Sequence, residues 1–208
     1  MLSELSARGI PLPVELILSL IKVESEGKAG IVNPESQASG LMQVMPITLN
    51  DFNQRHKTDY TINDLRGKSD DSVRIQLQIG IDVLALYWQK AYEYLSNRNE
   101  GKKIPIDDVS RIADLFYVAG PGATRKRLDQ LSNPTWINVQ EAFPKWVALK
   151  HPRRVFATPI SWDLDKIGIW LESKLTGIKK ISKNPKTGFV AGILLLMWAH
   201  WLMKGKKK

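Results

Sequence analysis

Apolar side chains repeat at helical spacing in the first part of the chain. Between residues 13 and 25 they fall at i, i+3, i+4 and i+7: Val14, Ile17, Leu18 and Ile21. This spacing predicts an amphipathic helix that begins at Pro13 and ends before Gly27. The positions predicted to face solvent are Glu15, Ser19, Lys22 and Glu26.

Three further segments carry helical patterns. A loop over residues 27–40 leads into a short helix from Pro46 through Phe52. A long buried helix is predicted over residues 70–95, with core positions Leu77, Ile81, Leu84, Trp88, Tyr92 and Leu95. Another helix ends at the breaker Gly120-Pro121-Gly122, and its core positions are Val109, Ile112, Ala113 and Phe116. No strand alternation is convincing, so the pattern predicts a mostly α fold.

The pattern changes after Arg154. We expect a globular domain over residues 1–154, a basic amphipathic connector over 155–187, a transmembrane or membrane-associated helix over 188–203 and a basic tail over 204–208. Gly188 to Met203 is almost entirely apolar. As a helix it would rise only about 24 Å against a hydrocarbon core of about 30 Å, so a span would be short.

Charge is distributed unevenly along the 208 residues, whose net charge is +9. Residues 1–144 hold 16 basic and 18 acidic side chains, whereas residues 145–208 hold 14 basic and three acidic ones. The basic excess therefore flanks the apolar run, which favours anionic lipid head groups over nucleic acid as a partner.

The residue types that hold metals or cofactors are sparse. There is no cysteine, which excludes disulfides and thiolate metal sites. His56 and His151 are isolated in the sequence and His200 lies in the apolar run, so we expect no metal site. No glycine-rich phosphate motif is present, and we expect no cofactor.

One carboxylate stands out in the first helix. Glu24 lies at the edge of the apolar stripe, one turn beyond Ile21, whereas Glu26 points to solvent. A carboxylate partly shielded from water is more readily protonated, as a general acid must be. The alternative is that Glu24 only ends the helix and turns out to water.

Three ordered motifs connect Glu24 with a known family. Val23-Glu24-Ser25 ends the first helix, Gly40-Leu41-Met42-Gln43-Val44-Met45-Pro46 follows the loop, and Phe116-Tyr117-Val118-Ala119-Gly120 comes later. Together with the helix that carries Gln78-Ile79-Gly80, they resemble the soluble lytic transglycosylase family over roughly residues 13–131. The pattern departs at Val118, where the family has asparagine.

The resemblance implies a lysozyme-like catalytic domain that cuts the MurNAc-GlcNAc bond of peptidoglycan. Glu24 would act as acid and then as base, and the muramic acid hydroxyl would close an anhydro ring. The substrate-binding residues implied by the motifs are Ser25, Met42, Gln43, Tyr117 and Gly120. Tyr117 would hold Glu24 through its hydroxyl. The alternatives are a helix-end hydrogen bond for Ser25, packed cleft walls for Gln43 and Tyr117, and the core for Met42.

Other functions remain open at this point. A goose-type hydrolytic lysozyme would need a second acid, for which the exposed-loop residue Glu35 is available. A non-catalytic, membrane-anchored glycan-binding virion protein is the rival that Val118 favours. The N-terminus shows no secretory signal peptide, and with the apolar tail this suits a bacteriophage protein in the virion or at the host envelope. A bacterial envelope enzyme is the alternative, and nothing indicates the oligomeric state.

Overall fold

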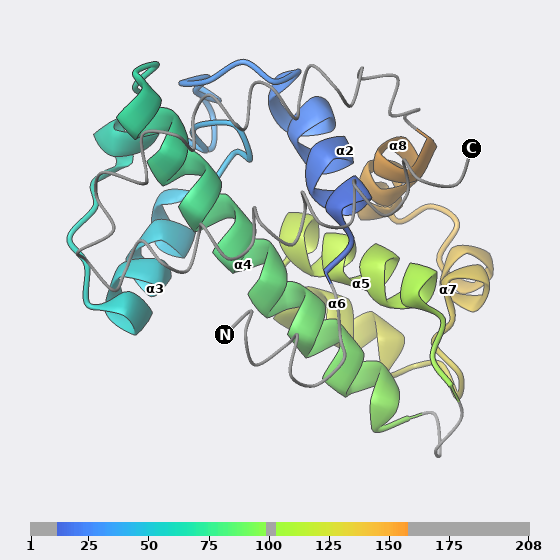
Figure 1. Cartoon of the computed structure of the whole chain (residues 1–208). Coiled ribbons are helices and arrows are strands. Elements are labelled where there is room, and N and C mark those ends of the chain that lie inside the picture. The colour runs from blue at the N-terminus through green and yellow to red at the C-terminus, as the bar shows by residue number, and fades with distance from the viewer. Residues whose placement is uncertain (1–11, 99–102, 158–208) are drawn as a thin grey trace, which may run out of the picture.

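A computed structural model describes residues 12–98 and 103–157 of the chain (Figure 1). Over these residues the protein is mostly helical, as predicted, and its β-structure consists of two isolated bridges, Val32 to Ser39 and Ser39 to Val44. The elements in chain order are α2 (Val14–Ser25), α3 (Pro46–His56), η1 (Ile62–Leu65), α4 (Asp70–Ser96), α5 (Ile106–Ala119), α6 (Pro121–Leu128), α7 (Trp136–Ala142), η2 (Val147–Leu149) and α8 (Lys150–Ala157).

Helix α4 is the axis of the domain and runs diagonally through Figure 1. It begins where predicted, because the Ser69 side chain caps it by accepting from the Ser72 amide. Its long apolar face packs against α5. Trp88 of α4 is buried there, and its indole Nε1 donates to Ser110 Oγ of α5 at 3.2 Å.

Helix α2 is more deeply buried than its pattern predicted. The predicted stripe is confirmed at Ile17, Leu18 and Ile21, but Leu16, Ser19 and Leu20 are buried as well. Ser19 was expected on the solvent face, so that expectation is wrong. Helix α2 also packs against α8, an element that the sequence pattern did not predict (Figure 1).

A glycine lets the loop before α3 lie directly on α4. A Cβ at Gly80 would lie 2.4 Å from the sulfur of Met42 and 2.8 Å from its Cβ. The Met42 side chain is fully buried in this contact. The segment Gly40 to Val44 is therefore placed by direct packing against α4.

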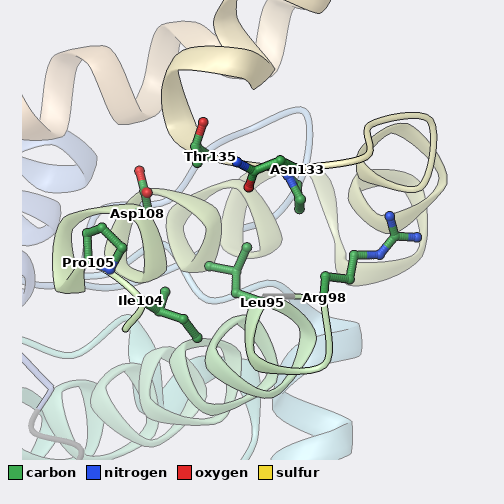
Figure 2. A pocket seen from close by; sticks show the side chains of 8 residues that line it. Leu95, Arg98, Ile104, Pro105, Asp108, Asn133 and Thr135 are labelled. Carbon is green, nitrogen blue, oxygen red and sulfur yellow. The ribbon is translucent and has the colours of Figure 1, made fainter. Parts of the chain in front are cut away.

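The far end of α4 is tied to the segment that leads into α7. Figure 2 shows the small pocket at this place, between the end of α4, the start of α5 and the residues before α7. Arg98 donates to the Leu131 carbonyl at 2.9 Å, and Asp108 accepts from the Trp136 amide at 3.0 Å. These bonds fix the path of the chain from α6 to α7.

The globular domain extends beyond its predicted end. Helix α8 continues past Arg154 to Ala157, and Val155 is 1% exposed within the core. Residues 155–157, assigned to the connector from the sequence, thus belong to the packed domain. The rest of the connector (158–187), the apolar run (188–203) and the basic tail (204–208) lie outside the described residues. Within the described ranges, no helix has the length and apolar character needed to cross a membrane.

We predict that Gly80→Ala destabilises the protein by about 1–3 kcal/mol, because the added methyl group must displace Met42 and its loop. Urea unfolding of the full-length protein measures the effect. Gly122→Ala in α6 is the matched control, because a Cβ there meets no atom within 4 Å, so the change should be neutral or stabilising. Equal effects at both positions would contradict the close contact at Gly80.

Candidate active site

The candidate acid Glu24 lies at the last turn of α2, one residue before the helix ends at Ser25. Its side chain is 18% exposed, so it is shielded from most of the solvent but reaches the surface. Glu26, two residues later, adopts a left-handed conformation and forms an exposed ion pair with Lys28 at 2.7 Å. The predicted contrast between a shielded Glu24 and a solvated Glu26 is confirmed.

His151 of α8 joins Glu24 to a second, fully buried carboxylate. Its Nε2 lies 3.0 Å from Glu24 Oε1, and its Nδ1 lies 2.9 Å and 3.0 Å from the two oxygens of Asp114 in α5. The Asp114 side chain is 0% exposed and that of His151 is 13% exposed. The imidazole thus bridges α2 and α5, and we name Glu24, His151 and Asp114 the carboxylate–histidine triad.

The two sides of the imidazole ring are held differently. Nδ1 makes true hydrogen bonds to Asp114. Nε2 is buried and, within the described residues, has no hydrogen-bond acceptor in good geometry. Its contact with Glu24 at 3.0 Å is therefore an ion pair.

Burial and charge within the triad shift the pKa values of His151 and Asp114. Burial alone lowers the pKa of His151, but the hydrogen bond to Asp114 and the negative charges of Asp114 and Glu24 outweigh it and raise that pKa to about 10. Burial raises the pKa of Asp114, against the opposing effect of its hydrogen bond to His151. His151 is therefore an imidazolium at neutral pH.

Tyr117 of α5 lies close to the triad but does not hold Glu24 as predicted. Its hydroxyl instead donates to the backbone carbonyl of Met42, which fixes the loop before α3 to α5. Burial, followed by the negative charge of Glu24, raises the pKa of Tyr117 well above its ordinary value. The phenol thus stays protonated beside the acid.

Ser25 and Met42 are buried and make their contacts within the protein. Ser25 is 3% exposed, and its hydroxyl donates to the Ile21 carbonyl at 3.0 Å and accepts from the Gly27 amide at 3.2 Å. Met42 is 0% exposed. Both were predicted to bind substrate, but these contacts match the alternatives of a helix-end hydrogen bond and a core side chain.

Gln43 and Gly120 shape the backbone around the site. Gln43 has φ 48°, and its Nε2 donates to the carbonyls of Ile31 at 3.2 Å and Gly40 at 3.0 Å. Both amide protons are thus used within the loop. Gly120 follows the last turn of α5, which carries Tyr117, and joins this helix to α6. Its φ of 77° is a backbone conformation that favours glycine.

The remaining positions of interest are exposed. Val118, at the family's asparagine position, is 42% exposed beside Tyr117. Glu35 is exposed in its loop, where its amide donates to Asn33 Oδ1 at 3.0 Å. Among the described residues, no hydrogen bond or ion pair joins Glu35 to Glu24.

Sequence reasoning missed two of the three triad members. His151 is isolated in the sequence, and its partners lie 127 and 37 positions away, so only folding brings them together. Asp114 falls to the side of the predicted stripe of α5, so the stripe did not show that it is buried. Helix α5 is buried nearly all round, with Ser110, Leu115 and Asp114 covered as well as the stripe.

Comparison with known proteins gives one match. A family model described as Transglycosylase SLT domain matches residues 6–134, which is more than half of the chain. Neither the search of curated proteins nor the search of solved structures finds a match. The matched region contains Glu24, Gln43, Asp114 and Tyr117, but it ends before α8 and His151.

We predict that the free energy of unfolding falls as pH rises from about 6.5 towards 9. The folded state holds the His151 proton up to a pKa of about 10, whereas an unfolded histidine releases it near 6.5. The stabilisation from this proton is therefore complete below pH 6.5 and is lost as pH rises towards 10. Urea unfolding at several pH values measures the slope, and His151→Gln should flatten it. An unchanged slope in that variant would mean that His151 is not charged in the folded protein.

Proposed function

Because the chain belongs to the transglycosylase SLT family, we propose that it cleaves the MurNAc-GlcNAc bond of peptidoglycan and leaves anhydro-MurNAc ends. The observation that carries this proposal is the placement of Glu24, an 18% exposed carboxylate at a helix end whose orientation is set by His151. A group in that position can meet a glycan strand from solvent while remaining shielded from bulk water.

Glu24 serves first as acid and then as base. It donates a proton to the glycosidic oxygen, and the bond to the anomeric carbon breaks with its electron pair on that oxygen. The resulting carboxylate then takes the proton of the muramic acid C6 hydroxyl, whose oxygen bonds to the anomeric carbon. No water is consumed, and the proton that Glu24 supplied is recovered from the C6 hydroxyl.

The other nearby carboxylates do not suit water activation. An inverting hydrolase needs a second carboxylate that faces the substrate across roughly 6.5–9.5 Å, and a retaining enzyme needs one at about 5 Å. Asp114 is fully buried behind His151, and Glu35 is exposed on a loop without a contact to Glu24 in the described structure. This favours the internal hydroxyl over water as acceptor, and thus a transglycosylase over a goose-type lysozyme.

Gln43 and Tyr117 are the side chains that we assign to the sugar-facing wall. The amide nitrogen of Gln43 is bonded within its loop, which leaves the Oε1 atom to accept from a sugar hydroxyl. Tyr117 presents a ring next to the acid. The exposed Val118 offers an apolar contact where the family has an amide, so sugar binding at this position relies on packing.

We further propose that the enzyme acts at a membrane, either in a phage virion during entry or at the host envelope. This proposal rests on the sequence: the apolar run 188–203, its flanking lysines and its tryptophans, Trp198 and Trp201, resemble an interfacial anchor. Peptidoglycan strands are the expected substrate, and anionic lipid is the expected surface.

The reaction is tested by the products released from purified sacculi. We expect fragments with anhydro ends, about 18 Da lighter than hydrolysed ones, in mass spectra. Glu24→Gln should lower the rate by at least about 100-fold, because the amide keeps the shape but cannot carry the proton. Glu26→Gln is the matched control and should retain full activity, since its side chain is solvated and pairs only with Lys28 in the described structure.

Other results would point to the rival functions. Reducing ends alone would identify a hydrolytic lysozyme. A folded protein that releases no fragments but sediments with sacculi would be a glycan-binding protein, and Val118→Asn would then test whether the missing amide silences the site.

The membrane proposal predicts that the full-length protein binds vesicles that contain anionic lipid in a flotation assay. A version that ends at Thr187, and so lacks the apolar run, should remain in the aqueous fraction. Full-length protein that fails to float with vesicles would contradict the anchor.

A further inference from the structure

We propose that His151, held by Asp114, is a positioning residue that stores the proton which Glu24 delivers to the glycosidic oxygen. The inference rests on the proposed function and adds to it the source of the catalytic proton. His151 lies outside the region that matches the family model, so the match does not assign it a role.

The geometry gives His151 two distinct partners. Asp114 accepts at Nδ1 from inside the core, at 2.9 Å and 3.0 Å, and Glu24 lies at Nε2 on the solvent side, at 3.0 Å. Because Asp114 engages Nδ1, the ring keeps its Nδ1 proton, and the proton at Nε2 is the one free to move. That proton lies against the proposed acid.

Among the described residues, Asp114 and Glu24 are the titratable groups that shift the pKa of His151. The elements packed against α8 are α2, α5 and η2, which contribute Glu24, Asp114 and no titratable side chain, respectively. Tyr117 of α5 adds a phenol beside Glu24. The basic neighbours on α8 itself are exposed: Lys150, Arg153 and Arg154.

The proton count of the site closes over one turnover. In the proposed resting state the mobile proton lies on Nε2 of His151, between Asp114 and Glu24. A small rotation aligns Nε2 with Oε1, and the proton passes to Glu24 and from there to the departing sugar oxygen. Glu24 then takes the proton of the C6 hydroxyl and returns it to Nε2.

The same arrangement assists the charge that develops on the sugar. After the proton has left, the Glu24 carboxylate faces the oxocarbenium-like centre, and the neutral imidazole and the buried Asp114 carboxylate lie behind it. Negative charge in a water-poor site stabilises a developing cation more than it would in water. The negative charge that pairs with His151 before the reaction thus stabilises the positive charge of the transition state once the proton has left.

This role predicts a distinctive pH profile. A glutamate that acts without a proton store must start protonated. Activity would then be lost as pH rises towards neutrality. With the proton held on His151, activity should persist through neutral pH and fall only as His151 deprotonates, towards about pH 10. The alkaline limb of kcat/KM therefore reports on His151.

The decisive variants are His151→Gln and Asp114→Asn in the full-length protein. Glutamine preserves a hydrogen-bond donor for Glu24 but cannot carry a proton, so we expect kcat at pH 8 to fall roughly 100-fold with little change in KM, and the alkaline limb to move to acid pH. Asparagine at position 114 removes the buried charge, and the alkaline limb should move about 1–3 pH units lower.

His56→Gln is the matched control. His56 also pairs with a buried carboxylate, Asp82, at 3.1 Å, but it lies on α3 outside the site. Its replacement should leave kcat, KM and the pH profile unchanged. If His151→Gln retains wild-type kcat and pH profile, the proton-storing role is wrong, and His151 only orients Glu24.

Nitrogen NMR of the histidine rings tests the inference without activity. Comparison with the His151→Gln spectrum assigns the signal, and His151 should remain an imidazolium through pH 8 in the wild type and titrate lower in Asp114→Asn. Titration of wild-type His151 near 6.5 would overturn the inference. Absence of glycan fragments from a protein in which His151 is still charged would refute the proposed function instead, so the two failures are distinguishable.

Discussion

The bridge from Glu24 through His151 to Asp114 determines how the domain is assembled around its site. It joins the end of α2, the middle of α5 and the first turn of α8, and the chain has no cysteine that could link them by a disulfide. A fully buried carboxylate is tolerated only if its charge and lone pairs are matched. The imidazolium meets this requirement, and in doing so it sets the position of the shielded acid. Placement of α8 on α2 and α5 is thus part of building the site.

A second set of contacts places the loop that holds Gln43. Gly80 lets the backbone of α4 approach Met42, and the Met42 carbonyl accepts the hydroxyl of Tyr117. Through these two contacts the loop that holds Gln43 is tied to both α4 and α5. Neither contact involves the reacting atoms, but each limits how far the loop that holds Gln43 can move relative to Glu24.

Local sequence patterns predicted the features that depend on neighbouring residues. Helical spacing correctly indicated a mostly α fold, the start of α4 and the difference in exposure between Glu24 and Glu26. Motif matching brought Gln43 and Tyr117 to attention, but it could not say that Ser25 turns back onto the Ile21 carbonyl or that Met42 points into the core. Side-chain direction in a loop or at a helix end depends on tertiary packing, which the pattern does not contain.

Features that depend on distant residues were inaccessible to pattern reasoning. His151 lies on α8, a short helix that the sequence pattern did not predict, and the domain was expected to end at Arg154. Its importance comes from partners on α2 and α5 that the linear sequence separates widely. A signal did exist in Asp114, an acid within a helix that is otherwise closely packed, but it becomes visible only once α5 is known to be covered on nearly every side.

The energetics of Asp114 argue that the triad serves more than stability. Replacing a buried ion pair by well-packed apolar side chains is often neutral or stabilising. The stability of the folded state alone therefore does not explain why such a pair is present. Helix α5 already buries Ile112, Leu115 and Phe116 around this position, and its core does not require a charge there. A carboxylate at the centre of the helix makes sense when its effect on His151 is considered, because it keeps the imidazole protonated at neutral pH beside Glu24. The free-energy cost of burying the Asp114 charge is thus offset by its effect on His151 and, through His151, on Glu24.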